Sequence, residues 1–376
     1  MEERIFLSPP HMCGDEVVLT QEAFASNWIA PLGPFVDRFE RELGTYLDGR
    51  YVCATSSGTG ALHLGLMVLG VTKGDRVYCS DFTFSASANI IRYCGAEPVF
   101  IDSDEKTWQM DPACLEAALA RDKRENRLPK AVIVVDLYGI SANYDAILPL
   151  CEAYGVAVLE DSAEALGSTY RSKKCGCFGR VSGFSFNGNK IITTSGGGAM
   201  ISDDPELVKR ARFLATQARE PRPYYHHYEI GYNYRLSNIL AALGCGQMSV
   251  LEERVKARRE ICSRYHAMLG DIEGLSFMPE PEGAVSNCWL TVIQLDPEKI
   301  RLTPDALRLC LEEANIESRL VWKPMHLQPV FESCEFFGGD VCRKIFERGL
   351  CLPSGSALTQ TQQIRICDLI HKAILR

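Results

Sequence analysis

VAVLEDSAEALGS (residues 156–168) and FSFNGNKIITTSGGGAM (residues 184–200) are the two stretches that most strongly indicate the fold of this chain. In the first, Asp161 follows an apolar run that predicts a buried strand, and in the second, Lys190 follows a shorter strand-like run. Alone, such an Asp is often a turn or helix-capping residue, and such a Lys is often a solvated loop charge. Because both follow predicted strands of one sheet, together they favour a functional site.

An amine and a carboxylate in this arrangement are the two protein groups that pyridoxal 5'-phosphate (PLP) chemistry requires. The Lys190 amine can form a Schiff base with the aldehyde of this cofactor, and the Asp161 carboxylate can keep the pyridine nitrogen protonated, so that the ring withdraws electrons from the substrate. In a partly buried site, the opposite charge raises the pKa of the pyridinium, and shielded, cationic surroundings can lower the pKa of the lysine amine. We therefore predict that both residues are catalytic and that PLP is the cofactor.

The composition is that of a globular enzyme. With 376 residues, of which 46% are hydrophobic and 23% charged, the chain can bury a large core and is expected to form two domains. No apolar run approaches the ~20 residues of a membrane span, and the first residues lack the features of a secretory signal, which predicts a cytoplasmic protein without membrane insertion. A net charge of −8 disfavours nucleic acid as a partner.

The cysteines and histidines do not predict a metal site. The 16 cysteines are scattered, and the closest two, Cys175 and Cys177, are separated by a single residue, which is a poor match to zinc or redox spacing. His226 and His227 are adjacent and would point apart on a regular element. Reduced thiols and no metal ligand are therefore expected.

From residue 51 onward, short apolar runs alternate with helical patterns, which predicts a mostly parallel central sheet with crossover helices on both faces. The segment 235–269 predicts one or two long helices that lead out of this domain. After it, the strand-like run 289–295 and helical patterns at 303–316 and 360–375 predict a smaller α+β domain. The expected division places residues 1–250 in the PLP-binding domain and residues 251–376 in the small domain.

Ligands of such sheets bind beyond the carboxyl ends of the strands, so segments 56–60 and 81–84 should share a crevice with Asp161 and Lys190. TSSGTGALHL (55–64) places small residues at a predicted helix start, where backbone N–H groups can bind a phosphate. Thr59 and Ser185 could add hydroxyl groups. Phe84 could lie against the cofactor ring, and a core position is an equally good interpretation of it.

These residues give the chain a resemblance to the DegT family of sugar-nucleotide aminotransferases, which are PLP enzymes of fold type I. The resemblance rests on SSGTGALHL (56–64), DFTFSASAN (81–89), EDSAEALGS (160–168), FSFNGNKIITTSGGG (184–198) and GYNYRLSN (231–238). FLSPPHM (6–12), NWIAPLGPFV (27–36) and WKPMH (322–326) are further similar to the branch that makes UDP-4-amino-4,6-dideoxy-N-acetylglucosamine, the precursor of bacillosamine-type sugars.

The resemblance implies a set of cofactor-binding residues. In it, Lys190 is the Schiff-base lysine, Asp161 is the partner of the pyridine nitrogen and Phe84 lies against the ring. The remaining positions are Gly58, Thr59, Gly60 and Ser185 around the phosphate, Glu164 near the ring, and Asn233, which reaches the phosphate in the neighbouring subunit of a homodimer. Many relatives have histidine or glutamine where this chain has Glu164, whereas the bacillosamine branch also has glutamate there.

The implied reaction moves an amino group from L-glutamate to the 4-keto carbon of a UDP-linked 6-deoxy sugar. The residues expected to bind substrate are His11, Asn187, Trp322, Lys323 and His326. Trp322 could instead pack against the sheet domain, and Lys323 could be solvated. One alternative is an aminotransferase for another nucleotide sugar, such as a GDP-perosamine type or a UDP-sugar of different stereochemistry. A second is a sugar dehydratase on the same scaffold, which Lys190 disfavours because such dehydratases have histidine in place of the Schiff-base lysine. The third is a non-enzymatic regulator.

Overall fold

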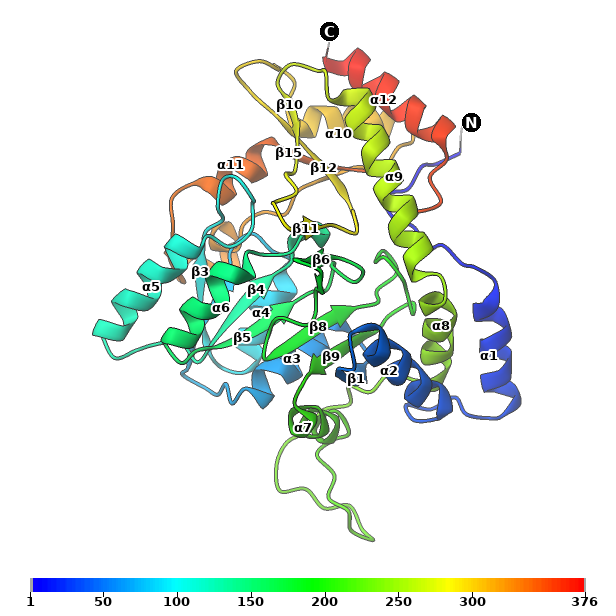
Figure 1. The fold of residues 1–376 in the computed structure, drawn as a ribbon, viewed down its shortest axis with the longest axis vertical. Helices are drawn as coiled ribbons and strands as arrows, with labels where there is room; N and C mark the ends of the chain where they lie inside the picture. The colour runs from blue at the N-terminus through cyan, green and yellow to red at the C-terminus, as the bar shows by residue number, and fades with distance from the viewer. Residues whose placement is uncertain (1–2, 375–376) are drawn as a thin grey trace.

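A computed structural model describes residues 3–374, and its centre is an eight-stranded sheet with helices on both faces (Figure 1). The strand order is β1-β9-β8-β5-β4-β2-β3-β14, and every strand except β9 runs in the same direction. The strands are β1 (Tyr51–Thr55), β2 (Arg76–Ser80), β3 (Glu97–Ile101), β4 (Ala131–Val135), β5 (Ala157–Asp161), β8 (Val181–Ser185), β9 (Gly198–Ser202) and β14 (Glu335–Phe337). This confirms the predicted α/β fold class.

The strands are apolar because helices cover both sides of the sheet. All five residues of β4 are buried, and alternate side chains enter different core layers. Ile133 belongs to the core layer that contains residues of α3, α4 and α7, whereas Val132 belongs to the layer that contains residues of α5 and α6. The helices of this unit are α1 (Asp15–Ala25), α2 (Pro34–Tyr46), α3 (Gly58–Val68), α4 (Ser85–Tyr93), α5 (Pro112–Arg124), α6 (Tyr144–Ala153), α7 (Pro205–Ala215) and α8 (Asn238–Met248).

A smaller unit with its own core lies beyond one end of the large sheet, and α9 (Leu251–Leu269) runs from the large unit into it (Figure 1). Its antiparallel sheet has the order β10-β12-β15-β13. These strands are β10 (Leu275–Phe277), β12 (Thr291–Leu295), β13 (Arg319–Leu320) and β15 (Gly349–Leu352), and the further helices are α10 (Pro304–Glu313), α11 (Val341–Arg348) and α12 (Gln360–Ile374). None of the helices within residues 3–374 is both long and apolar enough to cross a membrane.

The chain passes between the two units more often than the sequence predicted. The division after residue 250 remains a prediction, but β14, which follows it, pairs with β3 at the edge of the large sheet. Conversely, Ile5 pairs with Ile316 and lies in the core of the small unit. A linear division cannot capture either segment, because each is held by contacts with residues far away in the sequence. A third sheet joins β6 (Thr169–Tyr170) and β7 (Lys173–Lys174) to β11 (Ala284–Val285).

Charged side chains fasten β14 to the edge of the large sheet. Glu335 forms ion pairs with three arginines, Arg76 at 2.8 Å, Arg121 at 2.6 Å and Arg127 at 3.0 Å. The hydrogen bond from Arg76 is the largest of the effects that lower the pKa of the Glu335 carboxyl, to about 2. The same arginines surround the buried carboxylate of Asp122. A network in which each charge has several partners is more effective than isolated surface pairs.

Candidate active site

A cavity of about 470 Å³ lies at the carboxyl ends of the parallel strands. The turns after β1, β2, β5 and β8 all contribute to it, as expected for an open α/β sheet. The predicted site residues in its wall are Gly58, Thr59, Phe84, Asp161, Glu164, Ser185, Asn187, Lys190 and Trp322. The structure therefore brings together most of the predicted residues from segments that are far apart in the sequence.

Lys190 lies in this cavity with its side chain only 12% exposed. Its Nζ is 3.3 Å from Glu164 Oε1 and 4.0 Å from the centroid of the Trp289 ring. The Lys190 backbone N–H donates a hydrogen bond to the carbonyl oxygen of Asn187, which closes the turn after β8. The carboxylate and the ring face together hold the amine in the cavity.

Asp161 ends β5 and is buried in the wall of the cavity. Its Oδ2 accepts a hydrogen bond from Ser87 Oγ at 2.6 Å, and its Oδ1 accepts one from the Ala163 N–H at 3.1 Å. Burial raises the pKa of the Asp161 carboxyl, against the lowering effect of these hydrogen bonds and of the Lys190 charge. Among residues 3–374, no Lys, Arg or His forms an ion pair with Asp161. A buried carboxylate without a cation fits a protonated pyridine nitrogen as its partner.

Glu164 connects the lysine to the rest of the site. Its Oε1 accepts from Lys190 Nζ, and its Oε2 accepts from the Tyr138 N–H at 2.7 Å. Burial raises the pKa of the Glu164 carboxyl to about 7, although Lys190 and the Tyr138 N–H act in the opposite direction. In the described structure, Glu164 is therefore a direct partner of the lysine amine, and it is poised to hold a proton near neutral pH.

The raised pKa predicts that Glu164→Gln changes how the stability of the cofactor-free protein depends on pH. The carboxyl ionises near pH 4.5 in the unfolded chain but near pH 7 in the folded protein. Because the folded state binds this proton more tightly, ionisation of Glu164 lowers wild-type stability as the pH rises from 4.5 to about 7. The melting temperature of the wild type minus that of the variant should fall across this interval and then level off. A constant difference would contradict the raised pKa.

The start of α3 provides the phosphate end of the site. A Cβ atom at Gly58 would lie 2.8 Å from the Ser185 Cβ, so glycine allows the helix start to approach β8 closely. The N–H groups of Gly58 and Thr59 belong to the first helical turn, where the helix itself supplies no acceptor. The Gly60 N–H, in contrast, donates to Ser57 Oγ at 3.0 Å, and Gly60 does not line the cavity. A helix start, a lysine and an unpaired buried carboxylate in one cavity fit PLP.

Aromatic rings line the side of the cavity that faces the small unit. Tyr138 stacks on Trp322 at 4.7 Å between centroids and on Trp289 at 6.2 Å, and the Phe84 ring lies 5.7 Å from Trp322. Phe84 is 55% exposed, so it is not a core aromatic. Tyr138 and Trp289 were not among the predicted site residues, since the sequence indicated only a strand for the run 289–295 that contains Trp289.

Other predicted residues lie outside the cavity wall. The His11 ring contacts Ser356 Oγ and Arg254, at 3.0 and 3.4 Å, and Lys323 is exposed. Asn233 is also exposed and forms a bridge with Thr216. The basic residue that the segment RLVWKPMH (319–326) places in the wall is Arg319, four positions before Lys323.

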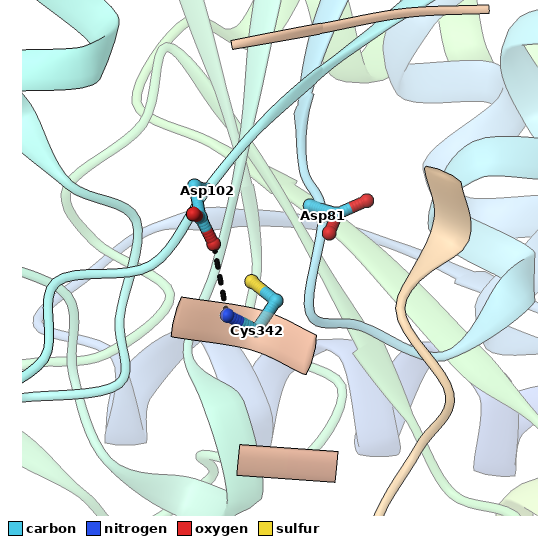
Figure 2. A group of neighbouring side chains, drawn as sticks. All are labelled: Asp81, Asp102 and Cys342. Carbon is cyan, nitrogen blue, oxygen red and sulfur yellow. Dashed lines mark hydrogen bonds between the residues drawn. The ribbon is translucent and has the colours of Figure 1, made fainter. Parts of the chain in front are cut away.

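His326 is held instead by an acidic group beside the site. Its Nδ1 and its N–H contact the two carboxylate oxygens of Asp81, at 2.6 and 2.8 Å. Figure 2 shows Asp81 near Asp102 and Cys342. One carboxylate oxygen of each aspartate and the Cys342 sulfur lie within 4.8 Å of one another. The Asp102 oxygens accept hydrogen bonds from the N–H groups of Ser103, Gly339, Val341 and Cys342. Because these oxygens already have N–H partners, the group is better explained as an anchor for residues 326–342 than as a metal site.

Known proteins resemble the chain over nearly its whole length. A model of the DegT/DnrJ/EryC1/StrS aminotransferase family matches residues 12–371. EpsN of Bacillus subtilis (strain 168), to which PLP-dependent aminotransferase activity is provisionally assigned, is 53% identical over 374 residues, or 98% of this chain and 96% of EpsN. GDP-perosamine synthase of Caulobacter vibrioides is 33% identical over 375 residues, or 99% of each chain.

A solved structure gives the same result for the fold. The crystal structure of a DegT/DnrJ/EryC1/StrS aminotransferase from Brucella abortus has a TM-score of 0.89 and 33% identity to this chain, with 96% of each chain covered. The family match, the identities and the cavity with Lys190 and Asp161 all agree. The chain therefore belongs to the DegT/DnrJ/EryC1/StrS aminotransferase family.

Proposed function

We propose that this PLP-dependent aminotransferase moves an amino group from L-glutamate to the 4-keto carbon of UDP-2-acetamido-2,6-dideoxy-4-keto-hexose in the cytoplasm. The product would be UDP-4-amino-4,6-dideoxy-N-acetylglucosamine, for bacillosamine-type glycans. The observation that carries the reaction type is the meeting of Lys190, Asp161 and Glu164 in one cavity. The choice of sugar rests on the resemblance to the bacillosamine branch, which also has glutamate at position 164.

The chain's own residues orient the substrates and move protons. PLP, when bound, supplies an aldehyde for the amino group and a ring that withdraws electrons from the neighbouring carbon. Lys190 Nζ removes the α-carbon proton of glutamate and, in the second half of the reaction, delivers a proton to C4 of the sugar. Asp161 holds the proton on the ring nitrogen. Glu164 orients the lysine amine through the 3.3 Å contact between its Oε1 and Lys190 Nζ.

We further propose that the nucleotide sugar enters along the aromatic side of the cavity. Trp322 and Asn187 line the wall and can contact the sugar. Arg319 and Lys190 are the cationic residues of the wall. Arg319 lines the cavity and Lys323 does not, so Arg319 is better placed to meet a diphosphate. His326 acts indirectly, because Asp81 and the stacked Phe336 ring, 4.1 Å away, hold its imidazole in place.

A homodimer with Asn233 shared between subunits is also part of the proposal. Asn233 is exposed in a segment that touches the end of β1, where Arg235 pairs with Thr55. It does not line the cavity of its own subunit. Both facts support its action on the cofactor phosphate of a second copy, with the two copies related by a two-fold axis.

A second candidate is a GDP-linked 4-keto-6-deoxy sugar. It is favoured by the GDP-perosamine synthase that is 33% identical over 375 residues of this chain. Discrimination between nucleotide sugars depends on a few hydrogen bonds, which a single substitution can change.

Incubation of the purified enzyme with PLP, L-glutamate and a panel of UDP- and GDP-linked 4-keto sugars tests the proposal. We expect equal amounts of 2-oxoglutarate and UDP-4-amino sugar, measured by mass spectrometry and stereochemically assigned by NMR. Preferential amination of the GDP sugar would replace the first candidate by the second. Failure to aminate any nucleotide sugar, with PLP bound, would contradict both.

A further inference from the structure

A second cavity, of about 420 Å³, lies in the small unit and contains two cysteines and a histidine. Cys262 and His266 are four residues apart on α9, so both side chains lie on the same face of the helix. Cys288 lies opposite them, in the segment before β12, with a left-handed φ of 51°. Cys262 and Cys288 are free thiols, and each is partly accessible.

The three side chains interact directly. The Cys288 thiol is the main group that lowers the pKa of the Cys262 thiol, and the His266 imidazole and the Thr291 hydroxyl also lower it. In return, Cys262 raises the pKa of both Cys288 and His266. Among the cysteines of residues 3–374 whose pKa is shifted, Cys262 is the one whose pKa is lowered. A thiolate beside an imidazolium and a second thiol is the arrangement of a reactive cysteine pair.

The other charged groups at this cavity compensate one another. Glu280 Oε1 is 3.0 Å from Arg259 Nη1 and also accepts a hydrogen bond from the Ser286 N–H. Arg259 Nη1 in turn donates to the Ser286 carbonyl oxygen. Glu280 and Arg259 therefore balance each other and hold the segment that leads to Cys288. His266 is left as the cationic partner of Cys262.

Cys288 lies between two residues that hold the active site. On one side, Asn287 Nδ2 donates to the carbonyl oxygen of Glu164 at 2.7 Å. On the other, Trp289 places its ring 4.0 Å from Lys190 Nζ. Arg258, on the same helix as Cys262, donates to the Trp289 carbonyl oxygen at 2.6 Å. A change in the position of Cys288 relative to α9 would therefore move the groups that contact Lys190.

We propose that Cys262 and Cys288 form an oxidative modification site, in which a peroxide links the two thiols as a disulfide and thereby lowers turnover at Lys190. The Cys262 thiolate attacks one peroxide oxygen, the O–O bond breaks, and hydroxide leaves as the sulfenic acid forms. The Cys288 sulfur then attacks the Cys262 sulfur, the S–O bond breaks, and the departing hydroxide takes the Cys288 proton. In sum, two thiols and one hydrogen peroxide give one disulfide and two waters.

Peptide mapping of the PLP-loaded enzyme tests the site without any sugar substrate. After treatment with a small excess of hydrogen peroxide and alkylation of the remaining thiols, we expect a peptide in which Cys262 is linked to Cys288, and its loss after dithiothreitol. Cys262→Ser and Cys288→Ser should each prevent the link. Cys310→Ser, which removes an exposed cysteine away from this cavity, should leave it unchanged. A thiol at Cys262 that survives while other cysteines oxidise would overturn the proposal.

The effect on turnover is measured on the same samples. The oxidised wild type should lose about tenfold to a hundredfold in kcat, because a small displacement of a positioning group has effects of this size, and dithiothreitol should restore it. The Cys288→Ser enzyme should keep its kcat under the same treatment. If the Cys262–Cys288 disulfide forms and kcat does not change, the proposal that this disulfide lowers turnover at Lys190 is wrong. Because peptide mapping detects the disulfide without any sugar substrate, failure of the proposed sugar specificity would not affect the test of the Cys262–Cys288 link.

Discussion

The Lys190→Ala variant is expected to lose about 10⁴-fold or more of kcat, because the change removes both the amine that binds the cofactor aldehyde and the group that moves the substrate proton. The visible absorption band of the bound cofactor should shift at the same time. Lys190 Nζ is the cationic group beside Glu164, so the variant also leaves that buried carboxylate unpaired. The measurements are kcat/KM with L-glutamate and the absorption spectrum of the PLP-loaded protein.

Lys190→Arg is the matched control for this experiment. Arginine keeps the positive charge near Glu164, but its guanidinium group does not lose a proton and cannot form the imine. We expect folding close to that of the wild type, with activity as low as in Lys190→Ala. Wild-type turnover in either variant would contradict the assignment of Lys190.

The same alanine variant also tests the shared site of the proposed dimer. Mixing Lys190→Ala subunits with Asn233→Ala subunits should form some dimers in which one site has both the lysine and the asparagine. We therefore expect activity to be recovered on mixing, up to about a quarter of the wild-type value. This fraction follows from random pairing, in which half of the dimers are mixed and each has one intact site. No recovery among dimers that have exchanged subunits would show that Asn233 does not act on the neighbouring site.

The second large effect is expected for Asp161→Asn, which should lower kcat by about 10²–10³-fold. Asparagine retains an oxygen that can accept from Ser87 or Ala163, but it cannot stabilise a proton on the pyridine nitrogen as a carboxylate does. Because burial already raises the pKa of the Asp161 carboxyl, the neutral amide should not destabilise the fold. The measurements are kcat for the half-reaction with L-glutamate and the melting temperature of the cofactor-free protein.

Ser87→Ala provides a comparison for Asp161→Asn. It removes the 2.6 Å hydrogen bond to Asp161 Oδ2 but leaves the carboxylate in place. The loss should be about tenfold, as expected for one hydrogen bond to a charged group. An Asp161→Asn enzyme with turnover equal to that of Ser87→Ala would contradict the electrostatic role of Asp161.

The central sheet and one half of the site were predictable because they depend on local patterns. A strand covered on both faces must be apolar throughout, as in β4, and residues that follow parallel strands must meet at one edge. These two rules place Asp161, Lys190 and Thr59 in a common cavity before any contact is known. Glycine at position 58 was also visible in the sequence, although the close approach to Ser185 that requires it was not.

The other half of the site depends on how the small unit packs, which local patterns do not specify. Trp289 is brought over Lys190 by the Arg258 hydrogen bond to its carbonyl oxygen and by the anchored segment around Asn287. Arg319, rather than Lys323, lines the cavity because β13 pairs with β15 and fixes which residues of this segment face the sheet domain. Both outcomes depend on contacts between residues that are distant in the sequence.

The position of β14 has a consequence for the way in which copies of the protein can associate. A bare outer strand offers a row of free amide and carbonyl groups, onto which another polypeptide can add and grow into a fibril. Here that border is closed by a strand of three residues, Glu335–Phe337, whose acidic first residue is surrounded by three guanidinium groups. Short length and charge both discourage the addition of a further strand at this border.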